Sequence, residues 1–163
     1  MEKAITLLGS TGSIGRQTLE VCNQMGIRVA ALAAHHSVDL LEQQVREFHP
    51  DLAVLYDIDA ALDLAKRLKG LPVRVAYGME GLVESMLPAV LMQLDPSLTY
   101  EQAVAAAQQM ANTELVPDSG ITVKSMLASA FAAHYAGDEE MPALVGQIVA
   151  QLGQSENPAY QLL

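Results

Sequence analysis

Residues 4–20 read AITLLGSTGSIGRQTLE, and the changes of character along this stretch decide how the chain begins to fold. The apolar run Ala4–Leu8 is typical of a buried strand, and it ends at a glycine-rich turn. A helix is expected after the turn, closed by Gly26. Its apolar face is predicted from helical spacing to comprise Ile14, Thr18, Val21, Cys22 and Met25. A strand, a glycine turn and a helix in this order form the frame that a phosphate-binding turn requires.

The turn itself, residues 9–15, reads GSTGSIG and carries the clearest chemical signal in the chain. Gly9 suits a sharp exit from the strand, Gly12 a close backbone approach to a pyrophosphate, and Gly15 tight packing of the helix. Free N–H groups at the helix start, with the helix dipole behind them, attract an anion. Hydroxyl donors are added by Ser10, Thr11 and Ser13. The spacing is G-x-x-G-x-x-G rather than the commoner G-x-G-x-x-G, and a purely structural turn is the alternative.

Further strands are expected at residues 27–33, 52–56 and 72–76, each separated from the next by a helical pattern. Strands that alternate with helices at such spacings predict a parallel sheet with right-handed crossovers. We therefore expect an α/β fold, a Rossmann-like parallel sheet with flanking helices, followed by a mainly helical C-terminal region.

The two helices between these strands have predicted starts, faces and ends. Ser37 is a candidate N-cap with Asp39 in the first turn, and Asp57 or Asp59 opens the next helix, which Gly70 ends. The predicted apolar faces are Leu41, Val45 and Phe48 in the first helix and Leu62, Ala65 and Leu68 in the second.

The chain changes character near residue 84. Residues 1–83 have a net charge of −2, whereas residues 84–163 hold a single basic residue, Lys124, and have a net charge of −8. We expect two regions, a nucleotide-binding domain over 1–84 and a mainly helical region over 85–163. Helices are predicted at 100–111, opened by a Thr99/Gln102 capping box, at 122–136 and at 142–152. The apolar stripe of the second of these is Val123, Met126, Leu127, Ala130, Phe131 and His134, and the pattern leaves open whether residues 86–94 form a strand.

Composition excludes several classes of protein. Of the 163 residues 51% are apolar and 17% are charged, so the chain can bury a core. The only cysteine is Cys22, which excludes an internal disulfide framework, and no apolar run reaches the length of a membrane span. A net charge of −10 argues against general nucleic-acid binding, and we expect a cytoplasmic protein. The acidic cluster 138–140 is interpreted as a solvated helix start, so no metal site is predicted.

The end of the second strand indicates which dinucleotide the turn would bind. NAD-binding domains usually place a carboxylate there to hold the ribose 2′-hydroxyl. This chain has Ala34-His35-His36-Ser37 instead. His36 and Ser37 can donate hydrogen bonds to a 2′-phosphate, so NADP(H) is favoured over NAD(H). A polar loop without a ligand is the alternative.

Four segments of the first half resemble the NADPH-binding domain of the 1-deoxy-D-xylulose 5-phosphate reductoisomerase family. They are AITLLGSTGSIGRQTLE, VAALAAHHSV, FHPDLAVLYD and YGMEGLVE, and the resemblance covers about residues 3–84. It implies that Thr11, Gly12, Ser13 and Ile14 contact the phosphates and ribose of NADPH, and that His36 and Ser37 occupy the 2′-phosphate position. Family members commonly have Arg or Lys, then Asn, at the last two places. Beyond residue 84, Thr113 stands where the family has a substrate-contacting lysine, and Gly120 where it has a metal-ligand glutamate.

The resemblance implies an oxidoreductase of isoprenoid biosynthesis. A complete family enzyme uses NADPH and a divalent ion, Mg²⁺ or Mn²⁺, to rearrange and reduce its substrate to 2-C-methyl-D-erythritol 4-phosphate. The catalytic domain has no room in the remaining residues, so we expect NADPH binding without reductoisomerase activity by this chain alone. One alternative is a non-enzymatic module that binds a nucleotide or self-associates, with a homodimer formed through the C-terminal helices. The other is a truncated or artificial chain that lacks the function.

Overall fold

The computed structural model describes residues 4–115, 118–135 and 137. The chain divides into two compact units after Ser85, and each is described by itself. Some of the features predicted above lie outside the described residues. They are the helix 142–152, the acidic cluster 138–140 and the side chains of Phe131 and His134.

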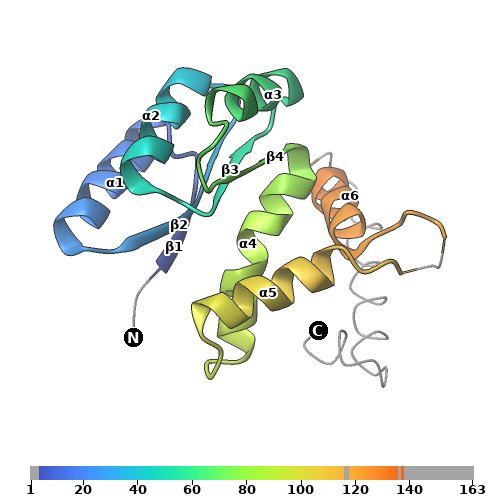
Figure 1. Ribbon diagram of the computed structural model, residues 1–163. Coiled ribbons are helices and arrows are strands. Elements are labelled where there is room, and N and C mark those ends of the chain that lie inside the picture. Colours follow the sequence, from blue (N-terminus) through green and yellow to red (C-terminus); the bar gives the residue numbers. More distant parts are fainter. Residues whose placement is uncertain (1–3, 116–117, 136, 138–163) are drawn as a thin grey trace. The chain divides into compact units, whose positions relative to one another are not determined.

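The first unit is built on a parallel four-stranded sheet with the order β1-β2-β3-β4 (Figure 1). The strands are β1 Ala4–Leu8, β2 Arg28–Ala34, β3 Leu52–Leu55 and β4 Arg74–Tyr77. The connecting helices are α1 Ser13–Met25, α2 Val38–Phe48 and α3 Ile58–Arg67. The expected α/β, Rossmann-like fold is therefore confirmed, and the fourth strand lies at 74–77 rather than 72–76.

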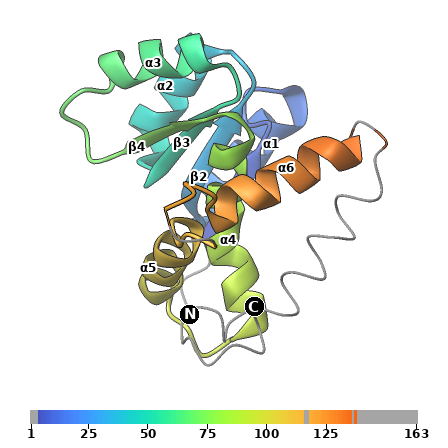
Figure 2. The same cartoon turned by 90° about the vertical axis from the view of Figure 1, so that its right-hand side faces the viewer.

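Both faces of the sheet are covered by helices. On one face, Leu19, Leu41 and Leu64 from the three helices pack with strand residues such as Leu32 and Leu55 in the main core. Figure 2 shows α2 and α3 side by side above this face. The opposite face of β2 and β3 packs against Leu82, which belongs to α4, Gly78–Leu94. The carboxyl ends of the strands are therefore left for the loops that follow them.

The predicted inner faces of α1 and α3 are largely wrong. Ile14 and Met25 are 78% and 69% exposed, whereas the buried residues of α1 are Gly15, Leu19 and Cys22. In α3, Leu62 is 52% exposed, and the buried positions are Ala61, Leu64 and Leu68. Each helix has more apolar residues than its contact with the sheet covers. The buried face of each helix includes a small residue, Gly15 in α1 and Ala61 in α3.

Other local expectations hold. Leu41 and Val45 are buried in α2 as predicted, and Asp39 lies in its first turn. Asp57, rather than Asp59, caps α3 by accepting a hydrogen bond from the Ala60 N–H at 2.8 Å. Ser37 occupies the N-cap of α2, but its side chain makes no capping hydrogen bond.

The described part of the second unit is mainly helical. Residues 86–94 continue α4 and form no strand, and α5 Tyr100–Ala111 and α6 Val123–Tyr135 follow. The predicted capping box is present, with hydrogen bonds between Thr99 and Gln102 in both directions. No helix among the described residues is long and apolar enough to cross a lipid bilayer.

The corrected face of α3 can be tested with two leucines of the same helix. Replacing Leu64, which is fully buried, by alanine should lower the free energy of unfolding by about 2–5 kcal/mol, because a cavity remains. Leu62→Ala, at an exposed position, should change it by less than about 0.5 kcal/mol. Urea unfolding followed by circular dichroism measures both. Equal losses in the two variants would contradict the assigned face.

Candidate functional site

The glycine turn is fastened to the end of the neighbouring strand. The backbone N–H groups of Gly9 and Ser10 both donate to the carbonyl oxygen of Ala33 at 2.9 Å. Gly9 has φ +74°, a left-handed conformation that glycine adopts without strain. These bonds bring the turn beside the residues that follow β2, as the Rossmann-like arrangement requires.

Two positions of the turn, 12 and 15, are occupied by glycine for different reasons. A Cβ on Gly15 would lie 2.3 Å from the Gly9 oxygen, so the helix approaches the turn more closely than any other residue allows. A Cβ on Gly12 would meet only that same oxygen, at 3.4 Å, an ordinary contact, and the φ of Gly12 is −73°. Packing of the chain itself therefore requires glycine at position 15 but not at position 12.

The first turn of α1 presents open backbone donors. We call the N–H groups of Thr11, Ser13, Ile14 and Gly15 the cradle amides. Within the described part of the chain none of them has a hydrogen-bond acceptor, whereas the Gly12 N–H donates to Gly9 O at 3.1 Å. The N-cap makes no side-chain hydrogen bond, and the first turn holds no acidic residue. Open donors at the positive end of a helix dipole form a site for an anion such as a phosphate.

Ser10 serves the turn rather than its open side. Its side chain is fully buried, and its hydroxyl donates to Gln44 Oε1 at 2.7 Å, so this hydroxyl is not available to a ligand as the sequence suggested. Gln44 Nε2 donates back to the Ser10 carbonyl at 2.9 Å. This reciprocal pair locks the turn to α2. The only hint of Gln44 in the sequence was a polar residue between Leu41 and Val45 on a buried helical stripe.

The predicted 2′-phosphate residues lie at the same edge of the sheet. His35 and His36 are exposed just after β2, and their Nδ1 atoms are 3.0 Å apart. The ring of His35 also stacks on Tyr56 with centroids 5.4 Å apart. His36 and Ser37 line an open hollow of about 470 Å³. The structure thus brings the turn and this second segment together, because Ala33 holds the turn three residues before His36.

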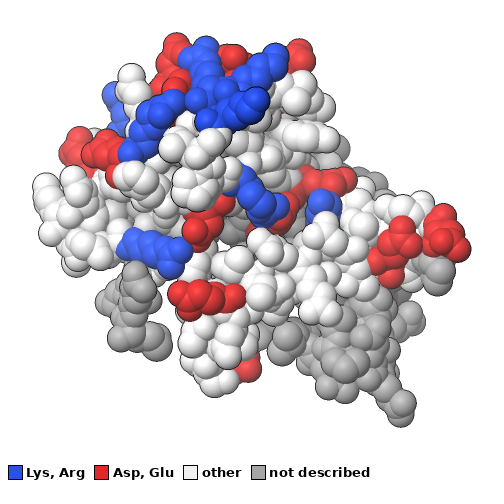
Figure 3. All heavy atoms as spheres, viewed as in Figure 1, with Lys and Arg blue, Asp and Glu red and all other residues white. Residues whose placement is uncertain are grey.

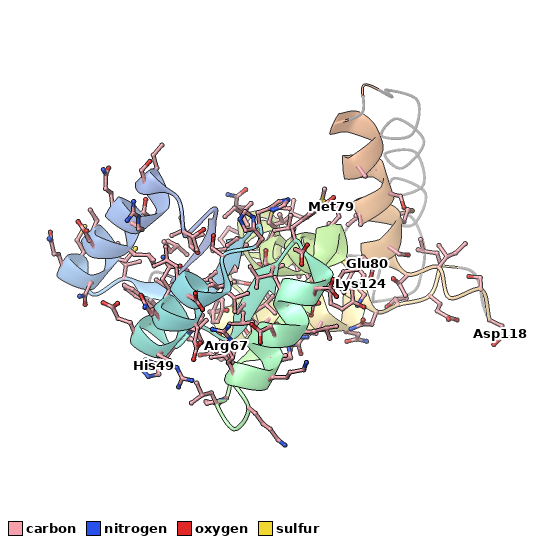
Figure 4. The ribbon with its side chains drawn as sticks, turned by 90° about the horizontal axis from the view of Figure 1, so that it is seen from above. His49, Arg67, Met79, Glu80, Asp118 and Lys124 are labelled. Atoms are coloured by element: carbon pink, nitrogen blue, oxygen red, sulfur yellow. The ribbon has the colours of Figure 1, made fainter. Side chains whose placement is uncertain are left out.

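Charged side chains gather over α2 and α3, where Lys and Arg are interleaved with Asp and Glu (Figure 3). Arg67 lies between the two helices (Figure 4) and pairs with Asp39, Glu42 and Asp63. The hydrogen bonds that the Arg67 guanidinium donates to Asp63 and then to Asp39 raise the pKa of Arg67 above its ordinary value. Arg46 in turn lowers the pKa of Glu42.

Nucleophilic and metal chemistry find little support in the described residues. Burial raises the pKa of the Cys22 thiol, which lies in the core of α1. The part of the chain that the structure describes contains no group of three or more His, Cys, Asp or Glu side chains placed to hold a metal ion. Thr113 donates its hydroxyl to the Gln109 carbonyl at the end of α5.

Comparison with known proteins gives a consistent result. The family model described as 1-deoxy-D-xylulose 5-phosphate reductoisomerase matches residues 5–115, so the similarity continues well past residue 84. The enzyme of that name from Lachnoclostridium phytofermentans is 55% identical over 82 residues, which are 50% of this chain and 21% of the relative. The one from Halothermothrix orenii is 38% identical over 138 residues, 78% of this chain and 36% of the relative. The chain thus spans between about a fifth and about a third of the length of these relatives.

Solved structures agree. The 1-deoxy-D-xylulose 5-phosphate reductoisomerase of Zymomonas mobilis in complex with NADPH has 33% identity and a TM-score of 0.50, covering 52% of this chain and 23% of that one. A DOX-P reductoisomerase in complex with NADPH, fosmidomycin and magnesium has 26% identity and a TM-score of 0.50, covering 69% of this chain and 29% of that one.

The lock between Ser10 and Gln44 can be measured as a coupling energy. Gln44→Leu should lower the free energy of unfolding by about 1–3 kcal/mol, because the Ser10 hydroxyl and carbonyl lose their buried partner. Gln43→Leu, on the exposed side of α2, is the matched control and should change it by less than about 0.5 kcal/mol. A double-mutant cycle with Ser10→Ala should give a coupling of about 0.5–3 kcal/mol in urea unfolding. Strict additivity would show that the two side chains do not act as a pair.

Proposed function

The chain belongs to the 1-deoxy-D-xylulose 5-phosphate reductoisomerase family, and on that basis we propose that it binds NADPH with the pyrophosphate on the cradle amides. The observation that carries the proposal is that these N–H groups have no acceptor among the described residues and lie in the turn that the family model matches. A pyrophosphate brings the acceptor oxygens and the negative charge that such a helix start favours. Solved relatives with the same fold are complexes with NADPH, which supports the choice of ligand.

Each residue of the site has a role in this proposal. Thr11, Gly12, Ser13 and Ile14 contact the phosphates and the adjoining ribose, and His36 and Ser37 take the 2′-phosphate. Gly9 and Gly15 give the turn its shape, and Ser10 holds it through Gln44. The absent Cβ at Gly12 leaves room for the pyrophosphate, since the chain's own packing does not require glycine there.

We propose that residues 1–84 form the NADP(H)-binding domain and that 85–163 form a mainly helical region. Bound NADPH supplies a hydride for the reduction that gives the family its place in isoprenoid biosynthesis, and this chain binds and orients it. The chain spans only part of its relatives, so we propose that it does not complete the reaction by itself. No metal ligand is assigned to its described residues.

Three finer expectations belong to the same proposal: a cytoplasmic location, no nucleic-acid partner and, as the alternative to a monomer, a homodimer formed through the C-terminal helices. The net charge of −10 supports the second. The stripes of α5 and α6 that suggested self-association include buried residues such as Ala107, Met110 and Val123. Their burial leaves less of each stripe exposed for contact with a second copy of the chain. Light scattering tests this point, because a dimer that persists at low concentration would favour the self-association module.

Gly12→Asp tests where the pyrophosphate sits. Aspartate is a favoured N-cap residue and the new Cβ fits, so the fold should be retained. The carboxylate would repel the pyrophosphate, and affinity for NADPH in calorimetric titration should fall by about 100-fold or more. Gln24→Glu, which adds the same charge at an exposed position of α1, should bind as the wild type does. Unchanged affinity in Gly12→Asp would place the cofactor elsewhere.

An activity assay tests whether the chain binds NADPH without catalysing the reaction. The purified chain should bind NADPH but should not oxidise it when 1-deoxy-D-xylulose 5-phosphate and Mn²⁺ are added, because none of its described residues is assigned to substrate binding. Absorbance at the reduced nicotinamide band reports turnover. Sustained oxidation that depends on the sugar phosphate would show that the chain is catalytically complete.

A further inference from the structure

The hollow at the carboxyl end of β2 contains a cation as well as the predicted 2′-phosphate residues. His36 and Ser37 lie on its wall, and so do Asp39, Asp63 and Arg67. The sequence does not indicate that the last three residues lie together, because Arg67 is 28 residues away from Asp39 along the chain. Any group that enters this hollow therefore meets a guanidinium and two carboxylates together.

The guanidinium of Arg67 is already engaged. Its Nη1 is 2.5 Å from Asp39 Oδ1 and 3.4 Å from Glu42 Oε2, and its Nη2 is 2.7 Å from Asp63 Oδ2. Its side chain is still 38% exposed, whereas that of Asp39 is 85% exposed. Asp39 is thus the most exposed of the three carboxylates that pair with Arg67.

The charge balance of the hollow matters for a phosphate. Apart from His36, the two carboxylates and the one guanidinium on its wall leave a formal negative balance. A phosphate monoester carries close to two negative charges at neutral pH and is held best by a free, bidentate guanidinium. A carboxylate beside a ribose instead accepts a hydrogen bond from a free 2′-hydroxyl. Asp39 therefore disfavours a 2′-phosphate in two ways: it pairs with the guanidinium, and it places a negative charge beside the ribose.

We propose that Asp39 determines the cofactor specificity of this chain: by occupying the Nη1 end of Arg67 in the hollow beside His36, it holds the preference for NADPH over NADH low. The inference rests on the proposed function, because it assumes that a nicotinamide dinucleotide lies on the cradle amides. It makes Arg67 a latent phosphate ligand, and Asp63, which binds the other end of the guanidinium, keeps Arg67 oriented when Asp39 is changed.

The test is the ratio of the dissociation constants for NADH and NADPH, measured by calorimetry in the intact chain. Asp39→Asn should raise this ratio about tenfold, because an amide oxygen competes with the 2′-phosphate for Nη1 of Arg67 less strongly than a carboxylate does, and one nearby negative charge is removed. Adding Arg67→Gln should return the ratio to the wild-type value or below. Glu101→Gln, which makes the same charge change in the first turn of α5, should leave the ratio unchanged.

Each outcome decides a different point. A wild-type chain that binds neither dinucleotide would overturn the proposed function and this inference with it. Binding of both dinucleotides with an unchanged ratio in Asp39→Asn would overturn only the inference. A raised ratio that survives Arg67→Gln would also overturn it, because the carboxylate would then act by bulk charge and not through the guanidinium.

Discussion

The close approach of α1 to the turn at Gly15 is the constraint on which the first unit depends. With no side chain at this position, the helix packs against the turn more closely than a Cβ would permit, and its first N–H groups have no acceptor among the described residues. The same turn is held by hydrogen bonds to the Ala33 carbonyl and by the hydrogen-bonded pair of Ser10 and Gln44. A phosphate-binding turn needs this rigidity, because donors that are already in place lose little entropy when they bind an anion.

Much of the fold was accessible from local sequence signals. The bounds of β1, the alternation of strands and helices, and the capping box at Thr99 follow from periodicity and side-chain chemistry within a few residues. The inner face of α1 was not accessible, because Ile14, Val21 and Met25 make a more apolar stripe than the one that packs on the sheet. The sheet selects the side that fits closest, and that is a tertiary choice.

The site shows the same limit. Its glycines can be read from the chain because each has a local reason, whether a left-handed turn at Gly9 or a close contact at Gly15. The contact between Ser10 and Gln44 joins residues 34 apart, and no local pattern predicts it. Sequence reasoning therefore finds the donors that meet a ligand more readily than the groups that position them. The pairing of Arg67 with Asp39, which we propose tunes the selectivity for NADPH, becomes evident only when α2 and α3 are packed together.

The central claim is that the cradle amides are the place where the nucleotide binds, and nuclear magnetic resonance tests it at those atoms. In ¹H–¹⁵N spectra of the labelled chain titrated with NADPH, the account predicts the largest shifts at the amides of Thr11, Ser13, Ile14 and Gly15. The chemical shifts of the α5 amides should not change. Saturable binding that leaves these four amides unmoved would contradict the account.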